Sequence, residues 1–503
     1  MGEYLLGIDG GNTSIKIVLF NRFGQKITMR SCQSVHLKSK KTGFEEYNAE
    51  DLWKRISREI HKLLMDTKIP AKEIKGIGIS TYGNGIVILG EEGKHIAPGI
   101  YSNDYRANAL ADELKKSDAG DVLQNITGGD LWGGQPGILL RWYKTYHPEI
   151  YRNIKHILLF GGYIIYRLTG CYTGNKNSMG GSALLDMKSG QYSEKLMRMY
   201  GIEEMFEYLP DLKEKASDIV GGVTKSAAEE TGLCEGTPVV SGMMDNLACF
   251  IGSGAGVPGI LNMVAGSWCV NQMVSDRIVS RASANMFYIY PGKYLTCFWS
   301  GASANNLEWL YEVFGNSIME CCNYDSVELY QRLNHIIKKN EVYPELFYLP
   351  YIAQPGVHPS AKAGFMGIDL NTTMEEIASV VAEGVVFIHK YHMDCFKNNG
   401  FSIEKIRFTG GISKSREWAK FFSDILEIPV EVVECDETGA HGVAIAAGVG
   451  VGVYKSYAQA FDECIHIAET HFPENKNVME RRKKYEKWRE LTTTLIPFWE
   501  KVH

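Results

Sequence analysis

A short turn near the start of the chain combines a carboxylate with glycines and hydroxyl groups. Residues Asp9–Ser14 read Asp-Gly-Gly-Asn-Thr-Ser and lie between the strand-like runs Tyr4–Ile8 and Ile15–Phe20. Glycines let backbone N–H groups converge on an anion, hydroxyls add donors, and a carboxylate such as Asp9 can hold a magnesium ion through water. An ordinary Asn/Gly hairpin turn has the same pattern, so this motif alone leaves both interpretations open.

Two further glycine turns occur in the second half of the chain. Gly266-Ser267 follows the apolar run 259–264, and Gly410-Gly411 follows the strand-like run Arg407–Thr409 just before a helical pattern. A helix N-terminus behind such a turn offers free N–H groups to a phosphate or nucleotide. A plain turn between a strand and a helix looks the same in sequence.

A fourth segment places a carboxylate where a strand gives way to a helix. Val239-Val240-Ser241-Gly242 has a buried-strand pattern, and Asp245 opens the probable helix that follows. A carboxylate at such a position can accept a proton from a substrate hydroxyl. It can equally serve only the helix, by interacting with the positive end of the helix dipole.

Two common nucleotide-binding signatures are excluded. Residues 254–259 match the glycine fingerprint of dinucleotide-binding folds, with Asp276 at a suitable distance, but a strand pattern follows where that fold needs a helix. The phosphate loop that ends in Gly-Lys-Ser/Thr is absent from the sequence.

The periodicity of apolar residues predicts two similar units. In the first, a strand-turn-strand hairpin is followed by a helix over 48–67 and a strand over 75–79. The second begins near residue 255 with another hairpin and continues with a helix over 373–398, a strand over 406–408 and a helix over 415–427. We expect a duplicated architecture of sheets flanked by helices, with the charged tail 473–503 as a solvated helix.

Bulk composition narrows the class of protein. A chain of 503 residues exceeds what one core usually supports, so we expect two domains with the site between them. The formal charge of −6 gives no field that would attract nucleic acid or an anionic membrane. The longest apolar stretch, around 443–453, is too short to span a bilayer. No export signal begins the chain, and the close pair Cys321-Cys322 lacks metal-type spacing, so a reducing cytoplasm is expected.

Together, in this order and spacing, the four segments resemble the FGGY carbohydrate kinases of the sugar kinase, heat-shock-protein and actin superfamily. The resemblance extends over nearly the whole chain. Supporting segments are Leu140–Trp142, His147–Glu149, Tyr166–Gly170, Leu349–Tyr351, Glu383–Val385 and Gly439–Ala444. It implies an α/β chain with two ribonuclease H-like domains of the actin-like ATPase kind, 1–250 for the sugar and the first phosphate turn and 251–503 for the second turn and adenosine, with a cleft between them.

The resemblance also implies a role for each matching residue. ATP would be contacted by Gly10, Gly11, Asn12, Thr13, Lys16, Gly266, Ser267, Gly410, Gly411, Ser413 and Ser415. Mg²⁺ would be held by Asp9 and Asp245, and Asp245 would be the catalytic base. The sugar would be contacted by Tyr82, Gly83, Asn84, Asp104, Arg106, Trp132, Gln135 and Asp245. These groups suit a polyol, because a carboxylate accepts hydrogen bonds, a guanidinium donates them and an indole stacks on the C–H face of a sugar. Trp132 fits core packing as well.

The expected reaction is transfer of the γ-phosphoryl group of ATP to a hydroxyl of a small sugar. The spacings Gly83-x-Gly85, Ser102-x-Asp104-x-Arg106 and Leu131-Trp132-x-Gly134-x-Pro136 look most like the L-xylulose kinase branch, so a ketopentose such as L-xylulose or D-xylulose is expected. Erythritol, glycerol, gluconate and 3-keto-L-gulonate remain alternatives, as does an actin-like ATPase that binds a protein partner. A homodimer is an expectation from the family alone.

Overall fold

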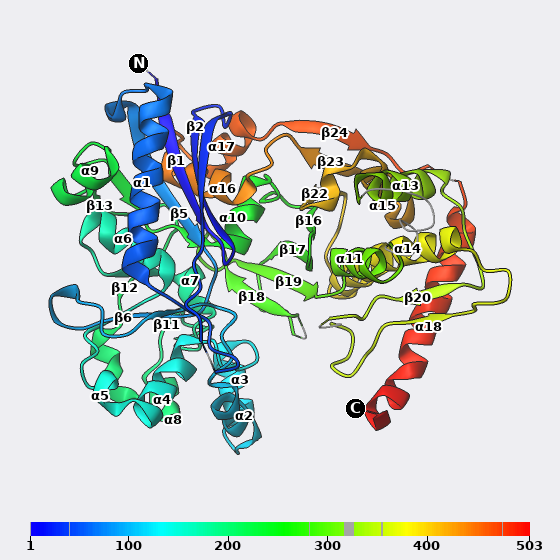
Figure 1. The fold of residues 1–503 in the computed structure, drawn as a ribbon, viewed down its shortest axis with the longest axis horizontal. Helices are drawn as coiled ribbons and strands as arrows, with labels where there is room; N and C mark the ends of the chain where they lie inside the picture. The colour runs from blue at the N-terminus through cyan, green and yellow to red at the C-terminus, as the bar shows by residue number, and fades with distance from the viewer. Residues whose placement is uncertain are drawn as a thin grey trace.

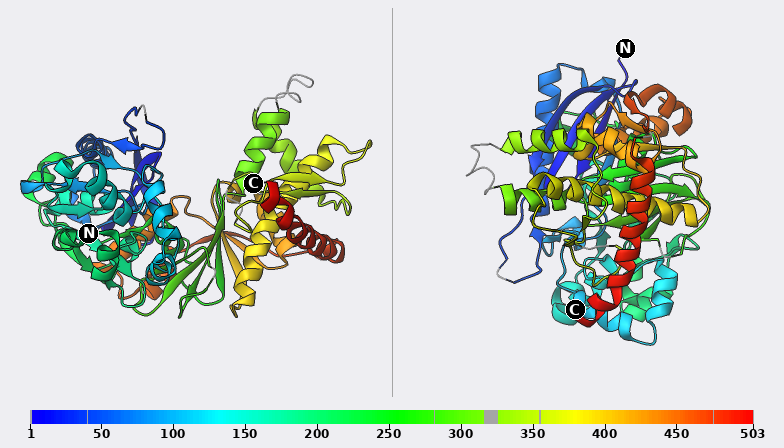
Figure 2. Two further views of the ribbon diagram at one scale, coloured as in Figure 1. Left: turned by 90° about the horizontal axis from the view of Figure 1, so that it is seen from below. Right: turned by 90° about the vertical axis from the view of Figure 1, so that its right-hand side faces the viewer.

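The computed structural model describes residues 2–39, 41–280, 282–315, 326–353, 356–474 and 476–502, and it forms two lobes (Figure 1). The Cys321-Cys322 pair lies outside these residues. Within them, each lobe is built around a seven-stranded sheet. Figure 2 shows that the lobes meet along one side and spread apart toward the other.

The N-terminal lobe centres on a mixed sheet with the order β13-β14-β5-β1-β2-β3, and β15 pairs with β5. Its strands are β1 (Tyr4–Gly10), β2 (Ser14–Asn21), β3 (Lys26–Gln33), β5 (Ile74–Thr81), β13 (Ile219–Gly222), β14 (Pro238–Val240) and β15 (Met243–Met244). One face, carrying Leu6 and Ile8, packs on α1 (Ala49–Thr67), α6 (Phe160–Thr169) and α9 (Lys225–Thr231). The other face, carrying Leu5, packs on α10 (Asp245–Gly252), α16 (Thr438–Gly450) and α17 (Tyr457–Cys464). Successive side chains of a strand point to opposite faces, so each strand contributes apolar residues to both packed faces of the sheet.

A smaller helical region extends this lobe beyond the carboxyl ends of its strands. Its helices are α2 (Asn108–Lys116), α3 (Gly120–Thr127), α4 (Pro136–Tyr146), α5 (Pro148–Tyr151), α7 (Lys176–Gly180) and α8 (Glu194–Tyr200). Short strands join it to the lobe: β4 (Glu46–Tyr47), β6 (Val87–Leu89), β7 (Gly99–Ile100), β8 (His156–Leu158), β9 (Thr173–Asn175), β10 (Leu185–Asp186), β11 (Gln191–Tyr192) and β12 (Asp211–Lys213). The region has a hydrophobic cluster of its own.

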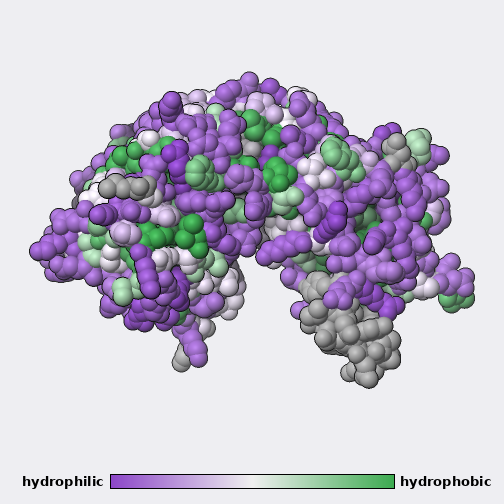
Figure 3. Space-filling model, turned by 90° about the horizontal axis from the view of Figure 1, so that it is seen from above, coloured by the Kyte–Doolittle hydropathy of each residue, from purple (hydrophilic) through white to green (hydrophobic). Residues whose placement is uncertain are grey.

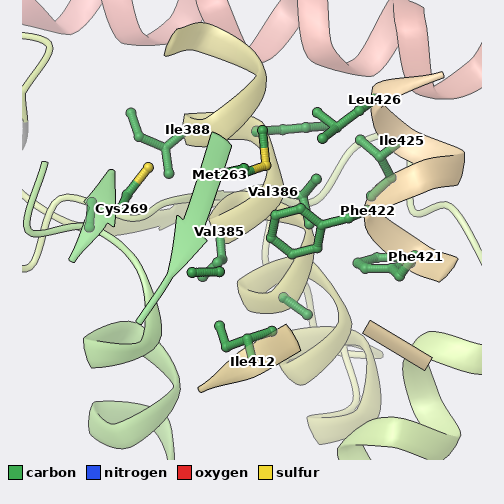
Figure 4. Close-up of a cluster of buried hydrophobic side chains, with 14 of the residues drawn as sticks. Met263, Cys269, Val385, Val386, Ile388, Ile412, Phe421, Phe422, Ile425 and Leu426 are labelled. Atoms are coloured by element: carbon green, nitrogen blue, oxygen red, sulfur yellow. The ribbon is translucent and has the colours of Figure 1, made fainter. Parts of the chain in front are cut away.

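The C-terminal lobe has a sheet with the order β18-β19-β17-β16-β22-β23-β24. Its strands are β16 (Ile260–Ala265), β17 (Cys269–Ser275), β18 (Ala284–Phe287), β19 (Tyr294–Ser300), β22 (Lys405–Thr409), β23 (Val430–Val433) and β24 (Ile467–His471). The helices around it are α11 (Ala304–Leu310), α13 (Ser326–Lys339), α14 (Met374–Asn398), α15 (Arg416–Leu426) and α18 (Val478–Val502), and the hairpin β20 (Phe347–Leu349) and β21 (Gly364–Met366) lies outside the sheet. Figure 4 shows residues of α14 and α15 packed against Met263 of β16.

The two sheets repeat one topology, as the sequence predicts. In the first, β1 runs antiparallel to β2, β2 antiparallel to β3, and β1 parallel to β5. In the second, β16 runs antiparallel to β17, β17 antiparallel to β19, and β16 parallel to β22. Each lobe is therefore a hairpin extended by one strand and then a crossover helix that returns a parallel strand to the hairpin. Strand β16 follows the glycine fingerprint 254–259, where a dinucleotide-binding fold needs a helix.

The two crossover helices begin with capping side chains. Asn48 accepts a hydrogen bond from the backbone N–H of Asp51 at the start of α1. Thr373 and Glu376 form a reciprocal capping box at the start of α14. Such caps satisfy N–H groups that have no partner inside the helix, and they explain why the predicted helix starts are confirmed.

The chain returns to the N-terminal lobe late in the sequence. Helices α16 and α17 pack on its sheet, and α16 crosses α10 at very short range. A Cβ atom on Gly252 would lie 1.9 Å from the carbonyl oxygen of Thr438, and one on Gly442 would lie 1.9 Å from that of Ala248. Only glycine permits this approach. A boundary between residues 250 and 251 separates the two sheets, although α16 and α17, which follow it in the sequence, pack on the N-terminal sheet.

The C-terminal helix α18 differs from the sequence expectation, because it is not fully solvated. Trp488 is 1% exposed, and Tyr485 and Trp499 are buried as well. On the same helix, Lys484 and Arg481 form buried ion pairs with Glu383 of α14. The high charge content of this segment therefore does not mean that every face of the helix is solvated. None of the described helices is long and apolar enough to cross a membrane.

Replacing Glu383 by Leu is expected to lower the free energy of unfolding by about 3–5 kcal/mol, because two buried cations lose their counter-charge. Glu345→Leu is the control, since Glu345 pairs with Lys487 but is 84% exposed at its side chain, and it should change stability by less than about 0.5 kcal/mol. Urea unfolding followed by tryptophan fluorescence measures both. Equal effects would contradict the buried role of Glu383.

Candidate active site

Two carboxylates lie at the carboxyl end of the N-terminal sheet. Asp9 is the penultimate residue of β1, and Asp245 directly follows β15. Strand β5 separates them, because its Ser80 is the register partner of Asp9 on one side and of Met243 on the other. The sheet thus brings together two acids that are 236 positions apart, 245 minus 9, in the sequence.

Asp9 is held in place by neighbours from three parts of the chain. The hydroxyl of Ser80 donates a short hydrogen bond to its Oδ1. A Cβ atom on Gly439, at the start of α16, would lie 2.4 Å from its Oδ2. Lys16, opposite Asp9 in the β1–β2 register, pairs at 2.7 Å with Glu437. Burial raises the pKa of Asp9 despite the opposing effect of the Ser80 hydrogen bond.

Asp245 is the first residue of α10 and is half-buried. Burial, followed by the nearby charge of Asp9, raises its pKa to about 7. The backbone N–H of Asn246 donates to its Oδ1 at 2.7 Å, which is the one contact that favours the ionised form. A carboxylate whose pKa is near neutrality is well suited to accept a proton at that pH.

The thiol of Cys249 lies one helical turn after Asp245 and shares its surroundings. Burial, together with the charges of Asp9 and Asp245, raises the pKa of this thiol to about 12. It is therefore uncharged and a poor nucleophile at neutral pH, so the two carboxylates are the groups in this cluster that can take up a proton.

Both glycine turns close hairpins and leave backbone N–H groups free. Gly11 N donates to Ser14 O at 3.0 Å, and Gly266 N donates to Trp268 O at 3.2 Å. Within the part of the chain that the structure describes, the N–H groups of Asn12, Thr13 and Ser267 have no acceptor. Free N–H groups in a tight turn form a site for anions. Both turns therefore have the geometry that phosphate binding needs.

The third glycine turn lies beside the second. Strands β16 and β22 are parallel neighbours with Val264 opposite Thr409, so Gly266 and Gly410 emerge at one edge. Gly410 has a φ of +98°, and a Cβ atom there would lie 2.6 Å from Ala265 O. Glycine is required at this position for both reasons.

The two serines after this turn already have local partners. Ser413 Oγ donates to Gly410 O at 2.7 Å, and Ser415 caps α15 by accepting from Trp418 N. They shape the turn and the start of α15, and Gly411 next to them is exposed. An adenosine group at this turn would meet the backbone of the two glycines first.

The segment after β5 closely approaches Met244, just before α10. A Cβ atom on Gly83 would lie 2.1 Å from the sulfur of Met244, the residue before Asp245. Asn84 and Gly85 both have positive φ, and the buried Oδ1 of Asn84 has no hydrogen-bond partner among the described residues. The ring of Tyr82 is buried and stacks on Phe160. An unpaired buried amide oxygen in the segment that contacts Met244 is a candidate acceptor for a sugar hydroxyl.

Asp104 and Arg106 form a buried ion pair. Their side chains are 0% and 2% exposed, and Arg106 also pairs with Glu46 at 2.8 Å and lies over the ring of Phe44. Asp104 accepts from Glu45 N at 2.7 Å as well. Neither side chain has a free face, and together they hold the segments 44–46 and 101–106 to each other.

Gln135 and Trp132 lie in the same loop but differ in burial and in hydrogen bonding. Gln135 is buried, accepts from the backbone N–H of Trp132 at 3.0 Å and donates to Gly181 O at 3.2 Å. The indole of Trp132 is half-buried and lies against Gly134. Gln135 therefore positions the loop, and Trp132 keeps a face on which a sugar could stack.

These residues lie at the edges of the two central sheets, one in each lobe. Figure 3 shows that the surface is deeply indented between the two lobes. The turn at Gly10–Thr13 and Asp245 lie at the edge of one sheet, and the turns at Gly266 and Gly410 lie at the edge of the other. Comparison with known proteins identifies this arrangement.

The models of the FGGY family of carbohydrate kinases match residues 4–252 for the N-terminal domain and 261–451 for the C-terminal domain. The chain belongs to this family. The FGGY chain is 30% identical over 498 residues to a protein of Pasteurella multocida named as a probable L-xylulose kinase, with 98% of this chain and 99% of the relative covered. It is 29% identical over 506 residues to the L-xylulose/3-keto-L-gulonate kinase of Escherichia coli, covering 100% and 99%.

Solved structures support the fold of this FGGY kinase. The xylulose kinase of Rhodospirillum rubrum superimposes with a TM-score of 0.89 at 22% identity, covering 99% of this chain and 100% of that one. The gluconate kinase of Lactobacillus acidophilus gives 0.88 at 19% identity, with both chains fully covered. The protein is thus an ATP-dependent sugar kinase with the two-domain actin-like architecture that the sequence predicts.

Several neighbours of the site were not among the predicted residues. Ser80 donates to Asp9, Glu437 pairs with Lys16, and Ser102 exchanges hydrogen bonds with Asn12 at 3.0 and 3.2 Å. Ser80 could have been suspected, since it directly follows the predicted strand over 75–79. Glu437 had no local signal, because its partner lies 421 residues away.

In protein free of metal and nucleotide, Asp245→Asn is expected to raise the melting temperature relative to the parent increasingly as pH rises from about 5 to 8. The native pKa of Asp245, about 7, exceeds the ordinary value of 3.8. The unfolded chain therefore ionises this group first, and its cost to the native state grows between about pH 4 and 7 and then levels off. Scanning calorimetry of both proteins across this pH range measures the difference in melting temperature. A difference in melting temperature that is independent of pH would contradict the raised pKa.

Proposed function

We propose that this FGGY kinase transfers the γ-phosphoryl group of ATP to a hydroxyl of a ketopentose, with L-xylulose as the first candidate and Asp245 as the base. The observation that carries the proposal is the place of Asp245. It is a half-buried acid with a pKa of about 7, beside Asp9, at the start of a helix between two turns with free N–H groups.

In this proposal the phosphates lie between the two hairpin turns. Gly10 to Thr13 bind from one lobe and Gly266 with Ser267 from the other, while Gly410 and Gly411 line the adenosine side. Phosphoryl transfer needs mainly positioning and neutralisation of charge, which facing turns on two lobes supply. Lys16 contributes positive charge close to Asp9, partly offset by Glu437.

The two carboxylates fit a magnesium ion. Asp9 and Asp245 lie close enough for the charge of one to raise the pKa of the other, and neither has an ion-pair partner among the described residues. Oxygen ligands of this kind suit Mg²⁺, so both would hold the ion, Asp9 through water. When bound, the ion neutralises phosphate charge. Asp245 keeps the task of accepting the proton of the attacking hydroxyl.

The choice of L-xylulose rests on the relatives and on the loops of the sugar side. Two relatives at 29–30% identity over the whole chain are named for L-xylulose, and one of them also for 3-keto-L-gulonate. Asn84 and Trp132 are the candidate contacts to the sugar, with Gln135 and the Asp104–Arg106 pair behind them. A group that pairs with one epimer leaves a polar atom unpaired with another, which favours a single stereochemistry.

Asp245→Ala is expected to lower kcat about 10²–10⁴-fold while the protein stays folded, because general-base catalysis contributes that much. Asp66→Ala is the control: Asp66 is half-exposed, pairs with Arg30 and lies outside the site, so its turnover should match the parent. A coupled assay of ADP release measures both. Near-normal turnover of Asp245→Ala would remove this residue from the role of base.

ADP release from Mg-ATP should rise with one ketopentose well above that with its epimers. The panel comprises L- and D-xylulose, L- and D-ribulose, 3-keto-L-gulonate, erythritol, glycerol and gluconate, with identification of the phosphorylated product. Best kcat/KM with a sugar other than L-xylulose would correct the substrate. No stimulation by any member would favour the partner-binding ATPase instead.

A further inference from the structure

Strand β17, which begins just after the second phosphate turn, carries polar side chains on both of its buried faces. Cys269 and Asn271 face α14, where the Asn271 amide lies within hydrogen-bond distance of His389 and His392. Gln272 faces the opposite way, toward α10. All of these side chains are at most 2% exposed. Apolar side chains would fill such positions at no cost in hydrogen bonding, so the polar ones call for a reason.

On the α10 side, a row of hydrogen bonds runs along the helix. Ser253 Oγ donates to Asn262 Oδ1 at 3.2 Å, Asn262 Nδ2 donates to Gln272 Oε1 at 2.9 Å, and Gln272 Nε2 donates to Asn246 O at 3.5 Å. Asn262 and Gln272 are directly opposite each other in the β16–β17 register. We call this row the amide ladder.

The amide ladder reaches both ends of the base helix. Asn246 is the residue after Asp245, and Ser253 is the C-cap of α10. Its two amides belong to the hairpin whose tip is Gly266-Ser267. The ladder therefore connects the helix that carries Asp245, in one lobe, to the two strands that lead into and out of the phosphate turn of the other lobe. Figure 1 shows α10 next to β16 and β17 in the middle of the molecule.

Most other contacts of α10 are apolar, although His441 Nδ1 also lies 3.1 Å from Gly252 O at the end of the helix. The helix packs on α16 and on the N-terminal sheet mainly through apolar residues such as Leu247, Phe250 and Ile251. Apolar contact is not directional, whereas hydrogen bonds between buried amides have fixed geometry and a strong penalty when unpaired. A shift of about 1 Å between reacting groups can cost about 10²-fold in rate.

We propose that Asn262 and Gln272 are positioning residues, which set the distance between Asp245 and the phosphate turn at Gly266-Ser267. This rests on the proposed function, in which Asp245 is the base and that turn holds phosphate. The ladder contacts neither substrate. It acts by holding the base helix and the turn as one unit while the sugar loops of the N-terminal lobe remain free to move.

The test is the double variant Asn262→Leu/Gln272→Met, which removes both amides and leaves neither unpaired, so that much of the stability is retained. The control is Asn285→Leu. Asn285 is a buried amide of the same sheet that bonds to Val279 and Thr296 and not to α10. Each variant is assayed with the best sugar of the panel for kcat, KM and the ratio of ADP to sugar phosphate, and hydrogen exchange of residues 245–252 is measured in the same proteins.

The double variant should lose about 10–100-fold in kcat, with KM for the sugar within about threefold, an ADP to sugar phosphate ratio above one, and faster exchange in α10. Asn285→Leu should change none of these. A double variant with kcat within twofold of the control overturns the proposal. If Asp245→Ala proves active, the proposed base fails by itself, and the exchange data then decide the ladder: unchanged protection of α10 overturns it, and lost protection supports it.

Discussion

Two like charges at one sheet edge are the feature around which the N-terminal lobe is arranged. Asp9 and Asp245 lie at the ends of β1 and β15, on either side of β5. Burial raises the pKa of both, and the charge of Asp9 raises that of Asp245 further. Such a pair opposes folding, so its surroundings have to offset it. Ser80 donates to Asp9, Lys16 supplies a positive charge nearby, and the N-terminus of α10 faces Asp245. A stability cost retained at one place is typical of a functional site.

The duplicated hairpins explain how one architecture provides two phosphate turns. In each lobe the first two strands meet in a turn whose glycine N–H closes the hairpin and whose next N–H groups stay free. A βα crossover then returns a parallel strand that ends at the same edge, bringing Ser80 beside Asp9 in one lobe and Gly410 beside Ala265 in the other. Ligands of open α/β sheets bind at the carboxyl ends of strands, and here two such edges face one another.

Helices α10 and α16 cross on one face of the N-terminal sheet without side chains between them. Gly252 and Gly442 let α10 and α16 approach to backbone contact, which brings Gly439 against Asp9 and Glu437 to Lys16. Residues from the end of the sequence thereby complete a site that begins at its ninth residue. The amide ladder adds directional contacts between α10 and the hairpin of β16 and β17. A fixed contact between α10 and the C-terminal sheet, together with loops that can move at the sugar side, suits a kinase that closes around its substrates.

Local chemistry in the sequence was sufficient for the two repeated hairpins, the capped helices α1 and α14, and the glycine turns at Gly11, Gly266 and Gly410. These features depend on neighbouring residues, because hydrogen bonds in turns and caps span only a few positions. The resemblance carried by the same turns led to the family and to Asp245. The sequence could not show that Asp104 and Arg106 are occupied with each other and with Glu46, or that α18 buries one face. Nor could it show the partners of Asp9 and Lys16 or the ladder between α10 and β17. Those contacts join residues far apart in the chain, and only the packing of sheets and helices decides which of many polar side chains meet.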